Sequence, residues 1–530
     1  MTYIQINFLV FLIATIVLFY LFPVKHRWIA LLIMSIAFYG FSGVRGYVWI
    51  FVTSMSVWLG ARKMGQIYEA AGLEQEKASD RKQKKAIKNA AKARCRKVMT
   101  ALLVLNIGIL CVFKFTRFFV SPINSLLVHL GGAGGFTAAA LIMPLGISYY
   151  TFSAIGYVLD VYWQRVAYEK NYARFLLFEI YFLHILQGPI ERYGRLGERL
   201  KGTFRFDYDR ACKGIQLMVW GFFKKLVIAD RLDLYISSVY KGNAAETSGA
   251  IVWIAILFDV VFIYADFSGC MDIARGASEI MGIEMDLNFD HPFSSKSIVE
   301  FWRRWHMSLG GWFRDYVYYS ISTSKRVKNI SRFCSKKQLS KGLTRGLVTI
   351  LPVFITWVLT GLWHGTGKTY LAWGVYYACW IFMAVVFGDA AHEAAVKAGI
   401  NTEAWSWKAF QTVRTMLIFA GGRLLTRPGT LHKSWDFFRR ALLHLQPWAL
   451  FDDTLFQYGL DWKNFGVALA AIAVFGAVSM MQMRRPVRDT LGRQNLVFRW
   501  GVCLLAVLVI LVFGIYGPGY SASSFVYMEY

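Results

Sequence analysis

The chain has 530 residues, of which 56% are hydrophobic and only 17% are charged, whereas a soluble chain of this length would be about 25% charged. Apolar runs of about 17–20 residues recur along it, long enough to cross a bilayer core, so the composition excludes an ordinary soluble enzyme and indicates a polytopic helical membrane protein. The net charge of +27 would suit a nucleic-acid-binding protein, but Lys and Arg fall between the apolar runs, as the positive-inside rule describes, and no soluble domain is left to bind nucleic acid.

The first half of the chain alternates apolar runs with one long basic stretch. Residues 62–97 are dense in Lys and Arg, and their Ala-Lys-Arg composition predicts an exposed insertion of helical character on the cytoplasmic side. A solvated surface helix is the favoured interpretation of this insertion, and attraction to anionic lipid is the second. On this assignment the N-terminus lies outside the cell. The membrane segments expected in this half are 4–22, 28–42, 46–60, 99–120 and 137–159.

The second half departs from regular crossings in three places. Residues 172–187 are short and precede a basic stretch, so we expect a segment that enters and leaves on the cytoplasmic side and breaks at Gly188-Pro189. Charged residues interrupt 214–240 and leave its path open. The basic residues 427–440 fall near the outer side, which leaves an interfacial helix or a miscounted crossing. The C-terminus is placed outside the cell, and the remaining crossings are expected at 251–267, 347–363, 369–388, 464–482 and 500–516.

Two histidines are candidates for chemistry. His364 ends an uncharged run, where an ionisable side chain is costly to keep in a membrane, and an imidazole can take a proton from a hydroxyl near neutral pH. A histidine hydrogen-bonded at a helix turn is an equally good interpretation from residue type and position alone. His306 lies in FWRRWHMSLGGWFRDYVYYS (301–320), which taken alone favours an interfacial aromatic belt with snorkelling arginines.

The functional alternative for the segment around His306 is a cytoplasmic mouth lined by arginines. Guanidinium groups bind phosphate well, so such a mouth would take an anionic ligand such as a phosphate-bearing cofactor. The candidate donor-binding residues are Arg303, Arg304, Arg314, Trp302, Trp305 and Asp315.

Other polar residues carry weaker signals. The seven cysteines form no C-x-x-C pair, which argues against a disulfide framework or a zinc site, and we expect no bound metal. GTGKT (365–369) has the wrong spacing and context for a phosphate-binding loop. Asp259, Asp266 and Asp272 are more readily explained by structural pairing than by catalysis. Tyr527 is by default a terminal aromatic anchor, because a phenol is a poor nucleophile without a base beside it.

Several motifs in order along the chain resemble the membrane-bound O-acyltransferase superfamily, in the branch of the alginate O-acetyltransferase and teichoic acid D-alanyltransferase membrane subunits. The resemblance implies one transmembrane domain over residues 1–530, with the insertion at 62–97 and an extracytoplasmic tail at 517–530. It implies a ring of tilted helices around a thinned centre, crossed by a tunnel that holds an essential histidine. That histidine maps to His364, and the second family histidine maps to His306. The matching segments are MPLGISYYTFSAIGYVLDVY (143–162), QGPIERY (187–193), DFSGCMDIARGASEIMGIEMDLNFDHPF (266–293), EFWRRWHMSLGGWFRDYVY (300–318), LTGLWHG (359–365) and GIYGPGYSASSFVYMEY (514–530).

The resemblance also implies an activity. The expected reaction takes acetyl from acetyl-CoA on the cytoplasmic side, with no bound cofactor, and delivers it outward to a cell-surface polysaccharide through an extracytoplasmic SGNH or esterase-like acetyltransferase. The expected location is the bacterial cell membrane, with both termini outside. Related systems end in F-x-Y-x-x-F, with a tyrosine that carries the acyl group. Here Tyr530 replaces the last phenylalanine of that motif, and YSIS (319–322) replaces the usual PLGG, so a relay through Tyr527 and the identity of the acceptor stay open.

Two alternatives remain beside acetyl transfer. D-alanyl transfer to teichoic acid would need a cytoplasmic carrier protein in place of CoA. A transporter without acyl chemistry would belong to another class, and it should show inverted repeats and paired broken helices, which the sequence does not show.

Overall fold

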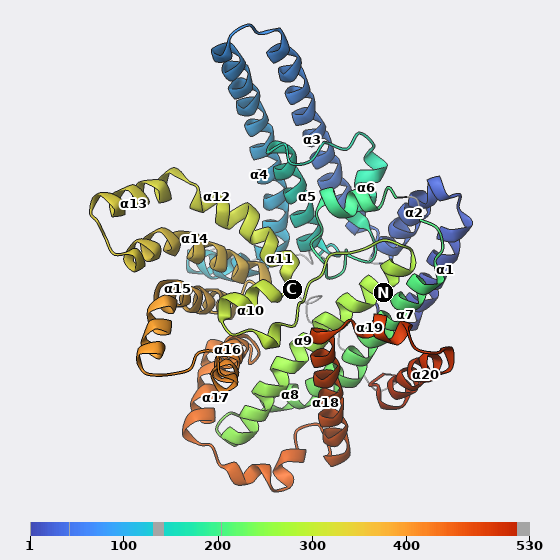
Figure 1. Ribbon diagram of the computed structural model, residues 1–530, viewed down its shortest axis with the longest axis vertical. Coiled ribbons are helices and arrows are strands. Elements are labelled where there is room, and N and C mark those ends of the chain that lie inside the picture. The colour runs from blue at the N-terminus through green and yellow to red at the C-terminus, as the bar shows by residue number, and fades with distance from the viewer. Residues whose placement is uncertain (1, 42, 131–142, 203, 517–530) are drawn as a thin grey trace. The chain divides into compact units, whose positions relative to one another are not determined.

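The computed structural model describes residues 2–41, 43–130, 143–202 and 204–516 (Figure 1). Over these residues the chain forms helices and no strand, apart from one isolated bridge between Phe289 and Trp305. The expected all-α fold class is confirmed. The chain divides into two compact units, Met1–Gly214 with Ala274–Asp286 and Ile215–Ile273 with Leu287–Tyr530. The single domain expected over residues 1–530 stays a prediction.

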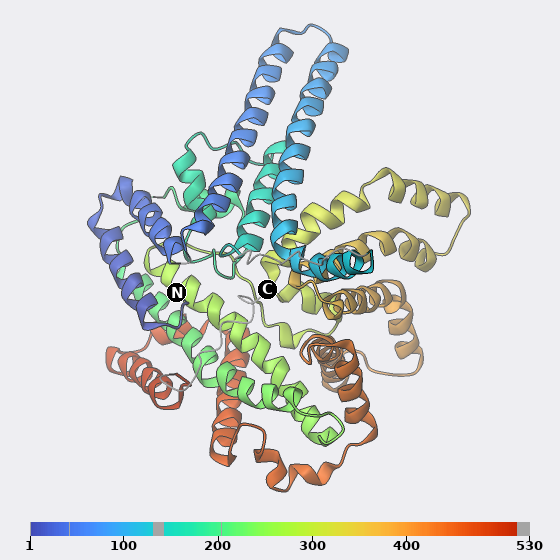
Figure 2. The ribbon, with the colours of Figure 1, turned by 180° about the vertical axis from the view of Figure 1, so that it is seen from behind.

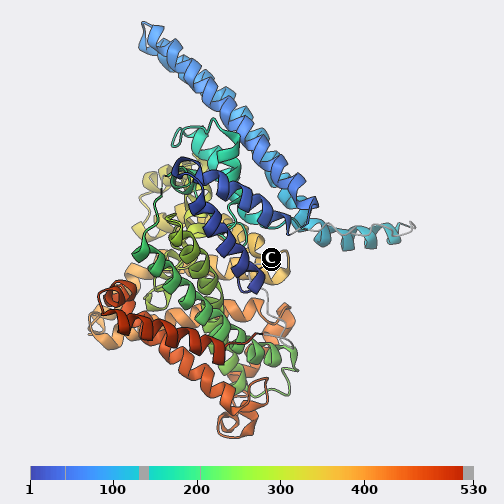
Figure 3. The same cartoon turned by 90° about the vertical axis from the view of Figure 1, so that its right-hand side faces the viewer.

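The first unit holds the N-terminal helices. Its most extended element is a hairpin of two long helices, α3 and α4, which run side by side in the views of Figures 1 and 3. The described elements of this unit are α1 (Ile6–Leu21), η1 (Val24–His26), α2 (Arg27–Gly40), α3 (Arg45–Lys77), α4 (Arg81–His129), α5 (Ile147–Tyr162), α6 (Tyr172–Ile180), the π-helical turn η2 (Tyr193–Gly197), the first turns of α7 (Tyr208–Phe222) and the end of α9 (Gly249–Ile280).

The basic insertion at 62–97 is helical and forms the outer part of this hairpin. One strip of small side chains on α4 is buried, with Ala91 5% exposed and Cys95 fully buried. The Sγ atom of Cys95 lies 3.6 Å from the carbonyl oxygen of Met64 on α3. The Lys and Arg side chains of residues 81–97 are exposed. The helical character predicted for the insertion is therefore confirmed. Its charged side chains point away from the small buried side chains that pack between the two helices.

The segment 172–187 does not form one continuous helix. Asn171 caps α6 through hydrogen bonds from the backbone N–H groups of Ala173 and Arg174. The helix then ends at Ile180 after nine residues, too few to cross a bilayer. The chain that follows, including Gly188-Pro189, is buried without regular helix. The length of α6 agrees with a segment that does not cross.

The second unit holds the remaining helices, and both sequence-predicted histidines belong to it. Its elements are η3 (Phe223–Ala229, π-helical), α8 (Asp230–Lys241), most of α9, η4 (Pro292–Ser294), α10 (Ile298–Arg304), α11 (Met307–Trp312), η5 (Phe313–Tyr318, π-helical), α12 (Tyr319–Ser322), α13 (Lys325–Lys336), α14 (Lys341–His364), α15 (Lys368–Lys397), α16 (Trp405–Thr426), α17 (Leu431–Leu443), η6 (Pro447–Leu450), η7 (Asp453–Phe456), α18 (Trp462–Arg484), α19 (Val487–Gly492) and α20 (Leu496–Phe513).

Among the described residues, six helices are long and apolar enough to cross a membrane. The chain is therefore a multi-pass membrane protein, as its composition predicts. A seventh helix, Ile6–Leu21, is apolar but shorter. The six candidate spans are Arg81–Thr116, Gly249–Ile280, Lys341–His364, Lys368–Lys397, Trp462–Arg484 and Leu496–Phe513.

The basic segment 427–440 does not form a helix long enough to cross a membrane. It contributes to α17, which has 13 residues and is too short to span about 30 Å of hydrocarbon. Only Ser434, Phe437 and Ala441 of this helix are buried, so its apolar contact is a narrow stripe. The length of α17 agrees with a helix that does not cross, and it argues against a miscounted span there.

The helices α14 and α15 form an antiparallel hairpin, and they lie side by side in both views of Figures 1 and 2. Two glycines allow their backbones to approach closely. A Cβ atom added at Gly361 would lie 2.4 Å from the carbonyl oxygen of Tyr370, and one added at Gly374 would lie 2.5 Å from that of Trp357. Both neighbours are backbone atoms, so they cannot rotate away. The hairpin therefore requires the smallest residue at each position.

We expect Gly374→Ala to separate α14 from α15 and to destabilise the protein by about 1–3 kcal/mol, the usual cost of overpacking. A lower thermal unfolding midpoint of the purified protein in detergent measures this. Gly388→Ala is the matched control on the same helix, because a Cβ at Gly388 meets nothing within 4 Å and Ala favours a helix over Gly. Equal midpoints for the two variants would contradict the close approach.

Candidate functional site

His306 lies at a sharp turn between two short helices. The helix α10 ends at Arg304, and α11 begins at Met307. His306 between them has a left-handed backbone with φ of +46°, which is uncommon for a residue with a side chain. The segment around Asn288 holds this turn in place, because Met307 N–H donates to the carbonyl oxygen of Asn288 at 2.9 Å and Asp290 N–H donates to that of Arg304 at 3.0 Å.

The His306 imidazole is enclosed by aromatic side chains and one amide. Its exposed fraction is 3%. The Phe267 ring of α9 meets it edge-on at a centroid distance of 4.7 Å, and its Nδ1 atom lies 3.3 Å from Oδ1 of Asn288. Burial lowers the pKa of His306 to about 3, because a charged imidazolium is poorly solvated there. The ring is therefore neutral at physiological pH and able to accept a proton or a hydrogen bond.

His364 is the last residue of α14, a candidate membrane span. Its imidazole is 7% exposed and lies between two indoles, with centroid distances of 4.8 Å to Trp363 and 5.1 Å to Trp373. His364 is therefore a buried imidazole at the C-terminal end of a membrane-length helix.

The two histidines share one neighbour. Trp363 lies 6.0 Å from the His306 ring and 4.8 Å from the His364 ring, measured between ring centroids. The sequence places these histidines at opposite ends of a long stretch, and folding brings both against the same indole. The result is a pair of buried imidazoles at the end of a membrane-length helix, among mostly apolar side chains.

The six proposed donor-binding residues do not form one cluster of freely available charges. Arg304 pairs with Glu300 at 2.8 Å and donates to Ser294 Oγ at 3.0 Å, and Arg314 pairs with Asp315 at 2.9 Å. Arg303 is exposed, and it has no ion pair within the described part of the chain. Of the three arginines, Arg303 is thus the one whose charge faces solvent without a carboxylate partner.

The two tryptophans of the same segment contribute to packing. Trp302 contacts Trp357, Trp373 and Tyr377 at centroid distances of 4.8, 5.7 and 4.7 Å. Because Trp373 also contacts His364, Trp302 packs against an indole that lies beside His364. Trp305 is 3% exposed and stacks on Phe301 at 5.4 Å. A donor that reached Trp305 would have to displace this packing. Tyr527 lies outside the described residues.

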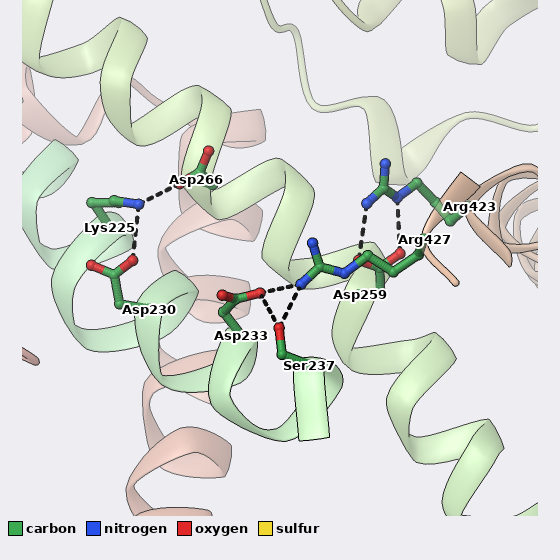
Figure 4. A network of polar contacts seen from close by, with 8 residues as sticks. All are labelled: Lys225, Asp230, Asp233, Ser237, Asp259, Asp266, Arg423 and Arg427. Atoms are coloured by element: carbon green, nitrogen blue, oxygen red, sulfur yellow. Dashed lines mark hydrogen bonds and ion pairs between the residues drawn. The ribbon is translucent and has the colours of Figure 1, made fainter. Parts of the chain in front are cut away.

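Lys225 and Asp230, to which the sequence assigned no role, form a buried set of charges with Asp266 in the same unit. Lys225 of η3 lies 2.7 Å from Asp266 of α9 and 2.9 Å from Asp230 of α8 (Figure 4). Lys225 and Asp230 account for part of the charge that interrupts 214–240, and each has an opposite charge beside it. The signal was available, since ionisable residues within apolar runs are expected to pair with one another.

A second group of ion pairs ties α16 to α9 and α8. Arg423 donates to both carboxylate oxygens of Asp259, at 2.9 and 3.0 Å (Figure 4). Arg427, at the C-terminal end of α16, contacts Asp259 and also binds Asp233 and Ser237 of α8. The structural pairing expected for Asp259 and Asp266 is therefore present. Both carboxylates hold helices together and are not available as an acid–base pair.

Comparison with known proteins decides what class of enzyme this site belongs to. The family model "MBOAT, membrane-bound O-acyltransferase family" matches residues 164–334, which include His306. A probable alginate O-acetylase of Pseudomonas syringae pv. tomato is 30% identical over 469 residues, 88% of this chain and 80% of that protein. The chain belongs to the membrane-bound O-acyltransferase family. It is an enzyme of acyl transfer to a hydroxyl, as the motifs predicted.

Other members of the membrane-bound O-acyltransferase family match over a smaller share of the chain. A peptidoglycan O-acetyltransferase of Helicobacter pylori is 26% identical over 299 residues, 52% of each protein. A teichoic acid D-alanyltransferase of Bacillus subtilis is 32% identical over 251 residues, 45% of this chain and 58% of that protein. The O-acetylating relative that covers most of this chain also spans His364.

Proposed function

We propose that this membrane O-acyltransferase moves an acetyl group from a cytoplasmic thioester donor, acetyl-CoA, to a hydroxyl for the O-acetylation of a polysaccharide outside the cell. The observation that carries the proposal is the pair of buried imidazoles, His306 and His364, which share Trp363 as a neighbour at the end of α14. The alginate O-acetylase relative, similar over 88% of this chain, supports acetyl as the group transferred and a polysaccharide as the final acceptor.

His364 acts as the general base in this proposal. It takes the proton of the acceptor hydroxyl as the hydroxyl oxygen bonds to the carbonyl carbon of the thioester. The carbon–sulfur bond then breaks, and the proton passes from the imidazolium to the leaving thiolate. The products are an ester and free CoA thiol.

His306 has a separate part, because burial keeps its ring neutral. A neutral imidazole beside the reacting groups can orient the donor or take part in proton transfer through a hydrogen bond. Arg303, exposed and without an ion pair among the described residues, is the arginine proposed to bind the phosphates of the donor. The remaining proposed donor-binding residues shape this part of the fold.

The acceptor is proposed to be either Tyr527, which then passes acetyl to an extracytoplasmic SGNH or esterase-like acetyltransferase, or a hydroxyl of that partner itself. Both routes need the C-terminus outside the cell. The membrane is proposed to be the bacterial cell membrane, with the basic hairpin of α3 and α4 on the cytoplasmic side, as the positive-inside rule favours. The N-terminus is then also outside.

The test uses inside-out membrane vesicles that contain the full chain. With radiolabelled acetyl-CoA outside, we expect label in an alkali-labile ester on protein or on polysaccharide inside the vesicles, and acetyl-tyrosine at position 527 by mass spectrometry if the relay operates. Vesicles without the chain are the control. Transfer from a D-alanyl carrier protein, with none from acetyl-CoA, would replace this proposal with D-alanyl transfer, for which the Bacillus subtilis relative is the precedent.

A further inference from the structure

Asn288 makes an unusual number of contacts with the turn that carries His306. Its Oδ1 atom lies 2.7 Å from Ser308 Oγ, 3.1 Å from Ser308 N and 3.3 Å from His306 Nδ1. Its Nδ2 atom lies 3.1 Å from Met271 Sδ. The side chain is 1% exposed. One buried amide therefore contacts both the histidine and the start of α11.

These contacts fix which end of the amide faces the histidine. A backbone N–H can only donate, so the atom 3.1 Å from Ser308 N must be the carbonyl oxygen of Asn288. The amide nitrogen then points to Met271 Sδ, a weak acceptor. With the amide turned over, two donors would face each other at Ser308 and the sulfur would face an oxygen. The orientation thus follows from the chemistry of the neighbours.

The orientation of the amide in turn fixes the imidazole tautomer. An amide oxygen accepts and cannot donate, so a neutral His306 can hydrogen-bond to it only if Nδ1 carries the proton. Nε2 then carries the lone pair. Three donors share the two lone pairs of Asn288 Oδ1. This sharing agrees with the contact to His306 Nδ1 being the longest of the three.

We infer that Asn288 is a positioning residue that holds His306 as the Nδ1–H tautomer and so presents Nε2 as the atom that accepts a proton or hydrogen bond in the acyl transfer. This inference rests on the proposed function for its consequence in catalysis. The tautomer itself rests only on the contacts of Asn288. The assignment resembles the way in which partners of one imidazole nitrogen set the role of the other in many sites.

A purely structural role must be separated from this one, because Asn288 also caps the first turn of α11 through Ser308 N–H. The variant Ser308→Ala removes the hydroxyl that donates to Asn288 and leaves the contact between Asn288 and His306. The variant Asn288→Asp keeps an acceptor oxygen of the same shape. The variant Asn288→Leu keeps most of the volume and removes the acceptor.

The direct test is nitrogen-15 NMR of the full chain in lipid, with labelled histidine. The chain has nine histidines, and the His306 signals are those lost in His306→Gln. We expect wild type, Ser308→Ala and Asn288→Asp to show a protonated Nδ1 at His306, and Asn288→Leu to lose that preference. A protonated Nε2 and bare Nδ1 in the wild type would overturn the inference, and this measurement needs no variant of Asn288 to fold.

Activity then tests the consequence. We expect Asn288→Leu to lower kcat for acetyl transfer about 10–100-fold, the usual range for removing a partner that orients a functional histidine, with the KM for acetyl-CoA changed less than about twofold. Ser308→Ala should retain kcat within about threefold. Equal losses of kcat in the two variants would mean that the contact with the Ser308 hydroxyl, which is all that Ser308→Ala removes, accounts for the effect, and the catalytic part of the inference would fail. If the wild type shows the Nδ1–H tautomer but transfers no acetyl, the proposed function fails and the tautomer assignment stands.

Discussion

Replacing His364 by alanine is expected to lower the rate of acetyl transfer by about 10²–10⁴-fold, the range that a positioned general base contributes. The physical reason is that, in the proposed mechanism, His364 takes the proton of the acceptor hydroxyl as the new carbon–oxygen bond forms, so its loss removes the base from the reacting atoms. We expect the loss to appear in kcat, since His364 acts on the reacting hydroxyl and not on the distant parts of the donor.

The measurement is the vesicle assay with radiolabelled acetyl-CoA, at equal amounts of membrane-inserted protein. His392→Ala is the matched control, because His392 is exposed on the adjoining helix α15. A thermal unfolding midpoint within a few degrees of the wild type shows that the His364→Ala protein is folded. Undiminished transfer by such a folded variant would remove His364 from the proposed mechanism and leave His306 as the only base of the pair.

The sequence was sufficient to predict the class of protein, because that class depends on local patterns, whereas the roles of His306 and His364 stay predictions. Long apolar runs predict membrane helices whatever they pack against, and the motifs around His306 and His364 identify the family. The helical character of residues 62–97 was also predictable from composition. These predictions needed no knowledge of which segment contacts which.

The arrangement of the site could not be predicted, because it depends on tertiary contacts between distant segments. Nothing in the sequence around His306 indicates that Trp363 lies beside it, or that Asn288 determines its tautomer. The ion pairs of the arginines could not be predicted from the sequence either. Arg304 and Arg314 stand out as a basic cluster in the sequence, yet each pairs with a carboxylate close to it in the chain, which leaves Arg303 as the one of the three arginines with no ion pair among the described residues.

The buried charges of residues 214–240 show why apolar patterning fails when ion pairs form between helices. Considered without its partners, Lys225 argues against a membrane crossing by this segment, because an isolated buried ammonium loses its hydration. In the structure Asp230 and Asp266 surround it. Asp266 precedes Phe267, whose ring lies edge-on to His306. The charges that obscured the path of this segment therefore also anchor the part of α9 that encloses the histidine.

We expect Lys225→Met to destabilise the protein by about 3–5 kcal/mol, the usual effect of removing one partner from a buried ion pair. The side chains of Lys225, Asp230 and Asp266 are at most 5% exposed, so the variant removes a buried cation that pairs with both carboxylates. The free energy of unfolding, from denaturant titration in mixed micelles, measures the loss. Lys408→Met is the matched control, since Lys408 pairs with Glu403 at 2.7 Å but both side chains are exposed, and such pairs contribute about 0–1 kcal/mol.

The triple variant Lys225→Met/Asp230→Asn/Asp266→Asn separates the charge from the packing. It also removes the charges of both carboxylates, so most of the lost stability should return, as when a whole buried ion cluster is replaced by neutral residues. If the loss arises instead from the shape of the lysine side chain, the triple variant should be no more stable than Lys225→Met. Acetyl transfer by the single variant should also fall, because displacement of Asp266 moves Phe267 away from His306. A single variant with wild-type stability and activity would show that Lys225, Asp230 and Asp266 do not hold η3, α8 and α9 together.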